Sequence, residues 1–186
     1  MKMKIALLAT MFAFAGVASA QSSVTATYGV QDLVPSGTQN HVVNFTAKTA
    51  INSTFAVDAG IQTTTADVAN TVTNRYEAGL TAGTAIGSFT PDVRLAVGQK
   101  QKSGVEAFSY YSIEPGVNAK LPAGFSARLA YRYRDAFNEA NADQSRTWRA
   151  SLGYNLTKSD KVTVGYDRLR GDGANNTTTI AYTRSF

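Results

Sequence analysis

Arginines that alternate with apolar residues are the most chemically informative feature of this sequence. Over residues 125–136, one set of alternate positions carries Arg128, Arg132 and Arg134, and the other set is mainly apolar and aromatic. Successive side chains of a strand point to opposite faces of a sheet, so this period places the guanidinium groups on one face. Such a face pairs with carboxylates when it is enclosed, or attracts anions when it lines a passage.

The same period of two runs through the chain from residue 23 onward, so the sequence predicts strands and almost no helix. Turn residues divide the alternation into ten predicted strands. These cover residues 23–32, 41–50, 54–64, 73–82, 90–101, 106–121, 125–136, 145–156, 161–170 and 177–186. The predicted fold class is all-β, with successive strands antiparallel.

The composition excludes several kinds of site. The chain has 186 residues, the size of one domain, and no cysteine. Disulfides, thiolate zinc sites, cysteine nucleophiles and a cysteine-linked lipid anchor are therefore excluded. No phosphate-binding loop, metal-ligand spacing or nucleophile elbow occurs, so we expect no cofactor and no metal.

The first twenty residues have the pattern of a secretory signal peptide. Lys2 and Lys4 precede an apolar stretch, and Ala18-Ser19-Ala20 forms an A-x-A cleavage site. We expect residues 21–186 to form the mature domain. Loss of the two lysines lowers the net charge of +5 by two, so the sequence gives little support to nucleic-acid binding.

The connections and the C-terminus point to a membrane. Short links at 51–53, 121–124 and 158–160 alternate with longer polar links at 33–40, 65–72 and 137–144. The chain ends with a strand that closes on Phe186 and has Ile180 and Tyr182 at alternate positions, although Arg184 departs from the apolar pattern.

These features resemble the bacterial outer-membrane β-barrel family, whose strands are joined by short periplasmic turns and longer outer loops. The resemblance covers the whole mature chain in architecture. It implies an antiparallel up-and-down transmembrane β-barrel of ten strands, or alternatively eight, in the cell outer membrane of a Gram-negative-type bacterium. It also implies two partners, the outer-membrane lipid and the barrel-assembly machinery that recognises the terminal strand.

Aromatic residues gather at both ends of the predicted strands, as membrane girdles do. Phe125 and Tyr133 are eight residues apart, which at about 3.4 Å per residue and a tilt near 40° spans roughly 21 Å of membrane height. The predicted girdle residues are Phe55, Tyr76, Tyr111, Phe125, Tyr133, Trp148, Tyr166 and Phe186.

A soluble periplasmic barrel or sandwich is the competing interpretation, because alternation alone does not say which face is enclosed. In that case the arginines would face water and the aromatic face would form the core. The glycines of the polar face favour the membrane barrel, because inside a narrow barrel each makes room for a long neighbour. These glycines are Gly79, Gly98, Gly116, Gly153 and Gly165.

If the apolar face contacts lipid, charges of both signs enter the barrel interior, where unpaired charges are costly. We expect them to form a network that plugs and stiffens a barrel of this size. A narrow porin-like channel with a weak anion preference is the alternative. The predicted lumen charges are Lys48, Asp58, Glu77, Asp92, Arg94, Glu114, Lys120, Arg128, Arg132, Arg134, Arg149 and Asp167.

The sequence thus predicts a small integral outer-membrane protein with a structural or interaction role in the cell envelope. A small subunit of a larger envelope or surface-layer complex is a further alternative. An outer-membrane hydrolase is another, with His41 near Asp32 or Asp67, but no nucleophile elbow accompanies this histidine, so we do not expect an enzyme. We interpret Arg170-Gly171-Asp172 as an ordinary turn.

Overall fold

The structure is a computed structural model that describes residues 21–34, 36–67, 71–141 and 143–186. The predicted signal peptide, residues 1–20, lies outside the described residues. Nearly all of the described chain is extended, and no helix in it is long and apolar enough to cross a membrane.

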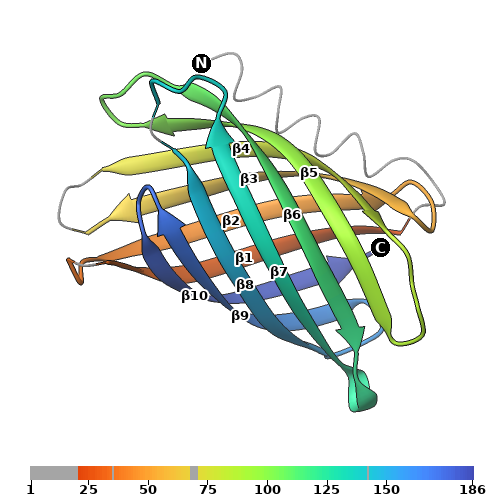
Figure 1. Ribbon diagram of the computed structural model, residues 1–186. Helices are drawn as coiled ribbons and strands as arrows, with labels where there is room; N and C mark the ends of the chain where they lie inside the picture. Colours follow the sequence, from red (N-terminus) through yellow and green to blue (C-terminus); the bar gives the residue numbers. More distant parts are fainter. Residues whose placement is uncertain (1–20, 35, 68–70, 142) are drawn as a thin grey trace.

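Ten antiparallel strands close into one up-and-down barrel, in which each strand pairs with its neighbours in sequence and β1 pairs with β10 (Figure 1). The ten-strand prediction is confirmed, with every boundary within two residues, and the eight-strand alternative is wrong. The strands are β1 (Ser22–Leu33), β2 (Gln39–Ala50), β3 (Phe55–Ala66), β4 (Val72–Gly83), β5 (Phe89–Lys102), β6 (Phe108–Lys120), β7 (Phe125–Ala136), β8 (Ser145–Asn155), β9 (Asp160–Gly171) and β10 (Asn175–Ser185).

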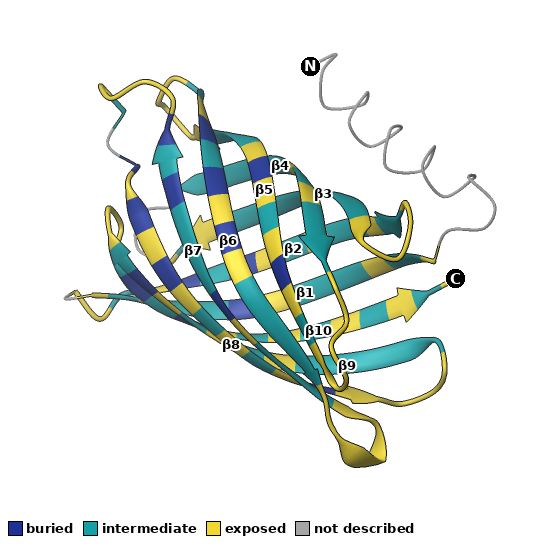
Figure 2. Ribbon diagram, turned by 45° about the vertical axis from the view of Figure 1, so that its right-hand side comes forward, coloured by how far each residue is buried: buried dark blue, intermediate teal, exposed yellow. Residues whose placement is uncertain are grey.

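The apolar side chains face outward and the polar ones face the enclosed interior, or lumen. On β7, Leu129 is 50% exposed whereas Arg134 is 4% exposed. Burial alternates in the same way along β6 and β8, which shows as bands in Figure 2. The soluble-barrel interpretation is therefore wrong for this structure, since it requires the arginine face to lie in water and the aromatic face to form the core.

The two rims of the barrel differ less than predicted. The terminal rim holds Gln21, Phe186 and the connections 51–54, 84–88, 121–124 and 156–159. The loop rim holds the connections 34–38, 67–71, 103–107, 137–144 and 172–174. The predicted long links shrink because the hairpin ladders extend into them, as in the bonds from Leu33 N to Thr38 O (2.9 Å) and from Ala66 N to Thr71 O (3.0 Å). Only 137–144 keeps its predicted length.

Glycines on the lumen face leave room for long side chains from the next strand. A Cβ on Gly79 would lie 2.6 Å from Arg94 Nη2, and one on Gly98 would lie 2.5 Å from the Tyr110 ring. Each contact is too close for any other residue without displacement of the arginine or the tyrosine. The glycines thus let these side chains lie flat across the sheet, where they reach partners on other strands.

The outward face of β7 gives a direct test of the membrane assignment. We expect Leu129→Arg to impair folding into bilayers, because a cation at mid-membrane on the lipid face costs about 2 to 4 kcal/mol. The measurement is the free energy of unfolding in phospholipid vesicles. Leu156→Arg is the matched control, because Leu156 is an exposed residue of the terminal rim, where the cost falls to about 0 to 1 kcal/mol. Equal stability of both variants would contradict the facing described here.

Candidate functional site

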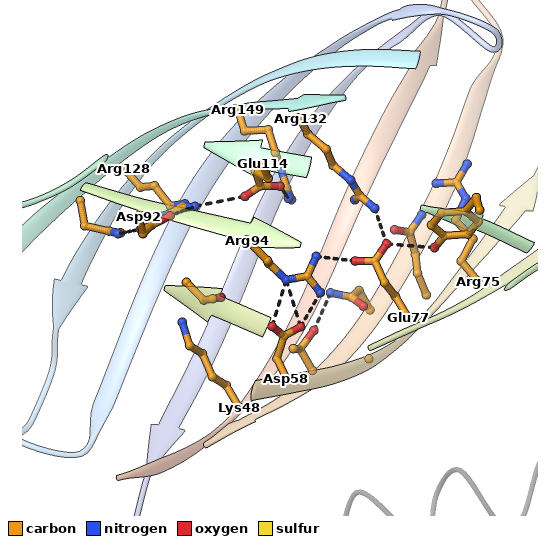
Figure 3. A pocket seen from close by; sticks show the side chains of 17 residues that line it. Lys48, Asp58, Arg75, Glu77, Asp92, Arg94, Glu114, Arg128, Arg132 and Arg149 are labelled. Carbon is orange, nitrogen blue, oxygen red and sulfur yellow. Dashed lines mark hydrogen bonds and ion pairs between the residues drawn. The ribbon is translucent and has the colours of Figure 1, made fainter. Parts of the chain in front are cut away.

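The candidate site is the lumen, where the closed sheet brings together charges that are distant in sequence. The strands contribute through their inward positions, so residues from β2 to β8 meet across the interior (Figure 3). Two chains of ion pairs account for most of the predicted lumen charges.

The first chain runs through β3, β4, β5 and β7 and centres on Glu77. Arg94 binds Asp58 through Nε (2.9 Å) and Nη2, and its Nη1 lies 2.6 Å from Glu77 Oε1. Arg132 Nη2 pairs with the other oxygen of Glu77, which also accepts a hydrogen bond from Tyr110 OH (3.0 Å). Glu77 therefore holds two guanidinium groups and a hydroxyl at once.

The second chain runs through β5, β6, β7, β8 and β9 and centres on Glu114. Arg128 donates Nη1 to Asp92 Oδ2 (2.5 Å) and Nη2 to Asp92 Oδ1 (2.9 Å). Its Nη2 is also 3.2 Å from Glu114 Oε1. Arg149 donates Nη1 to Glu114 Oε2 (2.8 Å) and Nε to Asp167 Oδ2 (3.1 Å). Bidentate and charge-assisted pairs of this kind offset the cost of removing the carboxylates from water.

A third cluster lies nearer the loop rim and includes residues that the sequence analysis missed. Arg134 Nε is 2.9 Å from Asp143 Oδ2, and Lys100 Nζ is 2.6 Å from Asp143 Oδ1. Asp143 is 1% exposed. Lys100 could have been found, because it continues the inward phase of Arg94. Asp143 lies in the connection 137–144, where no alternation exists, and the sequence gives no signal that this loop folds inward.

Arg75 is the other missed residue, and it differs from the paired arginines. It lies two positions before Glu77 and so shares its inward phase. Its Nε is buried and makes no hydrogen bond with the described residues, and none of their carboxylates lies within 4.0 Å of it. A buried guanidinium without a carboxylate attracts any anion that reaches it.

Lys48 and Lys120 are predicted lumen charges that the structure does not bring to a carboxylate among the described residues. Lys48 lies opposite Asp58 in the β2–β3 register but outside ion-pair distance. Cations consequently outnumber anions among the described residues that face the lumen. The cations are Lys48, Arg75, Arg94, Lys100, Lys102, Lys120, Arg128, Arg132, Arg134, Arg149 and Lys161, and the anions are Asp58, Glu77, Asp92, Glu114, Asp143 and Asp167.

Cavities lie beside these ion pairs. One of about 330 Å³ extends from Lys48 and Asn118, near the terminal rim, to Arg75. A second, of about 100 Å³, adjoins it, because Asn44, Gln62, Arg75, Arg132 and Arg149 line both. The side of the lumen away from the ion pairs is uncharged and polar, with Thr27, Gln31, Asn44, Thr46, Gln62, Thr177 and Thr179.

A layer of buried side chains lies near the loop rim, where there is also a third cavity of about 370 Å³. Asn40 Nδ2 donates to Gln31 Oε1 (3.0 Å) on one side of this layer. Tyr110, Arg134 and Asp143 fill the other side and are 1 to 4% exposed. Among the described residues, buried side chains therefore occupy the lumen near the loop rim.

The predicted girdle residues all belong to the outward phase of their strands. Toward the terminal rim are Phe55, Phe125 and Phe186, each more than 40% exposed. Toward the loop rim, Trp148 and Tyr166 are 55% and 47% exposed, Tyr111 packs 6.3 Å from Tyr133, and Tyr76 is half-buried. The two groups lie near opposite rims, as a membrane-spanning band requires.

His41 lies on the outward face rather than in the lumen. Tyr28 OH is 2.7 Å from its Nδ1, and Asp67 Oδ1 is 3.5 Å from its Nε2, whereas Asp32 instead binds Gln39. No group of three or more His, Asp or Glu side chains that could hold a metal occurs among the described residues. This arrangement supplies neither a serine nucleophile nor a metal site.

Disruption of the first ion-pair chain tests how much it contributes to the stability of the barrel. We expect Glu77→Gln to lower the free energy of unfolding by about 3 kcal/mol, because it leaves Arg94 and Arg132 sharing a neutral amide. Urea titration of the folded protein in detergent micelles measures this change. Glu106→Gln, the same substitution in the exposed connection 103–107, serves as the control and should change it by less than about 0.5 kcal/mol. A Glu77→Gln variant as stable as the control would show that the ion pairs of Glu77 contribute nothing to the free energy of unfolding.

Comparisons with known proteins identify the fold but no individual relative. No protein-family model matches the chain, and no curated protein matches it significantly. Among solved structures it is similar to the β domain of the Bordetella autotransporter BrkA, with a TM-score of 0.53 and 11% identity over 90% of this chain and 99% of that one. The KdgM porin has a TM-score of 0.51 and 13% identity, over 88% of this chain and 99% of that one. The NanC porin has a TM-score of 0.50 and 12% identity, over 90% of this chain and 100% of that one.

Larger barrels match only in part. The chain spans 49% of the length of an anion-selective porin from Comamonas acidovorans, with a TM-score of 0.45 and 13% identity over 78% of this chain. With its closed ten-strand topology and outward apolar face, this chain has the fold of the bacterial outer-membrane β-barrels.

Proposed function

We propose that this protein is an integral outer-membrane β-barrel whose lumen forms a narrow channel for small solutes, with a preference for anions. The observation that carries the proposal is the pair of adjoining cavities beside the ion-pair network, with cations in excess around them. The KdgM and NanC proteins, which share the fold over nearly their whole length, are named as porins. In this proposal the chain is secreted, the signal peptide is cleaved near Ala20, and the terminal rim faces the periplasm.

The ion pairs give such a channel its shape. Arg94, Arg128 and Arg149 are each held by two carboxylates, so their positive charge is largely neutralised and their side chains are fixed. Arg75 keeps its charge unpaired at the junction of the two cavities. Selectivity for anions then depends on Arg75 more than on the paired arginines.

A second candidate function is favoured by the buried layer near the loop rim. If Tyr110, Arg134 and Asp143 close the lumen, the protein is a plugged barrel with a structural or interaction role in the envelope. Its loops or its outer wall would then contact other envelope proteins. Neither candidate assigns a catalytic role to His41, and we propose that the chain is not an enzyme.

Single-channel recording in planar bilayers distinguishes the two candidates. The channel predicts discrete current steps, with a reversal potential under a salt gradient of the sign given by anion selectivity. Protein that inserts but stays silent would refute the channel and support the plugged barrel. Insertion is checked separately by protease protection of the reconstituted protein.

The role of Arg75 gives a sharper prediction. We expect Arg75→Gln to shift the reversal potential toward cation permeability while it leaves the free energy of unfolding within about 1 kcal/mol, because no described carboxylate loses a partner. Lys158→Gln, in the exposed connection 156–159, removes the same charge outside the lumen and should not change the reversal potential. If the two variants behaved alike in a conducting channel, Arg75 would not set the selectivity.

A further inference from the structure

The outer surface of the barrel carries a cluster of cations near the loop rim, on β8 and β9. Arg146, Arg168 and Arg170, here called the rim arginines, belong to the outward phase of these strands, the same phase as Trp148 and Tyr166. Arg146 and Arg168 are exposed, and Arg170 is partly exposed. None of the three faces the lumen, and neither candidate function above uses them.

The register of the sheet brings these like charges close together. Arg146 lies directly opposite Arg170 in the β8–β9 ladder, and Arg168 lies opposite Trp148. Like charges at directly opposed positions of an antiparallel pair destabilise the sheet unless an anion screens them. The arrangement therefore favours a bound anion on this surface.

Protein carboxylates do not supply that anion within the described part of the chain. None lies within 4.0 Å of a rim arginine, in contrast to most of the lumen arginines. The nearby Asp135 is bound by Tyr133 OH (2.6 Å), and Asp172 accepts a hydrogen bond from the backbone N–H of Gln144 (2.9 Å). Among the described residues, the side-chain hydrogen bond found for a rim arginine runs from Arg170 Nη1 to the carbonyl of Leu169 (3.0 Å).

The position of the cluster selects the kind of anion. Trp148 and Tyr166 lie two residues deeper along the same strands than Arg146 and Arg168, respectively. Aromatic girdle residues mark the membrane interface, so guanidinium groups just beyond them lie at the level of lipid headgroups. Arginine binds phosphate through paired N–H groups.

We propose that the rim arginines bind the phosphate groups of an anionic lipid of the outer leaflet, whose acyl chains lie against Trp148, Tyr166 and the apolar wall below them. This inference rests on the outer-membrane location proposed above, but it does not require that the lumen conducts. It makes the β8–β9 wall a lipid-binding surface distinct from the lumen.

Trp148 is the one tryptophan of the chain, so its fluorescence reports on this surface. The folded wild-type protein in neutral detergent micelles is titrated with lipid A that carries both phosphates and with dephosphorylated lipid A. We expect saturable binding of the phosphorylated lipid, about tenfold tighter than that of the dephosphorylated lipid. Equal binding of the two lipids would overturn the proposal. Inorganic phosphate that competes at the same concentration as the lipid would also overturn it, since the site would then bind free phosphate.

Two variants of equal charge locate the site. We expect R146Q/R168Q to weaken binding of the phosphorylated lipid about tenfold. K102Q/K158Q removes two exposed cations elsewhere, one of them at the same rim, and should change binding less than about twofold. An equal loss of lipid affinity in both variants would refute a specific site at the rim arginines. Folding of each variant is checked by its heat-modifiable mobility on gels. If R146Q/R168Q does not fold, the comparison of the two lipids on the wild-type protein tests the proposal by itself. A barrel that binds lipid in this way but stays silent in bilayers would refute only the channel.

Discussion

Closure of the barrel removes its inward carboxylates from water, and the cost of this desolvation determines how the inward side chains pair. With its apolar face turned outward, the closed sheet places most charged side chains of the strands in a narrow lumen, where a lone charge is costly. Glu77 and Glu114 meet this constraint by binding two arginines each. The paired arginines come from strands far apart in sequence, so the network also ties the barrel wall together across its interior.

The same constraint shapes the space that remains. Glycines such as Gly79 and Gly98 let long side chains lie across the wall instead of filling the centre. Cavities therefore persist beside the network, next to an uncharged polar surface. The lumen combines a rigid charged side with a neutral side, and the excess of cations gives that space a positive character.

The period of two was enough to predict the ten strands and most of the lumen charges, because each inward position follows from its strand alone. Which charges pair could not be predicted, since that depends on the register and stagger of the closed barrel. Asp143 was missed because it lies in a loop, where burial follows no period. The alternation assigns Lys48 and Lys120 to the polar face, but sequence pattern alone cannot show that carboxylates lie beyond their reach.

Ion flux into vesicles shows whether the positive lumen passes small anions. Tracer exchange of chloride and of potassium is followed in one preparation of proteoliposomes that contain the wild-type protein, with protein-free vesicles as the reference. We expect chloride to enter several-fold faster than potassium, and both rates in the reference to be negligible. Rates equal to those of the reference, or faster entry of potassium, would contradict this expectation.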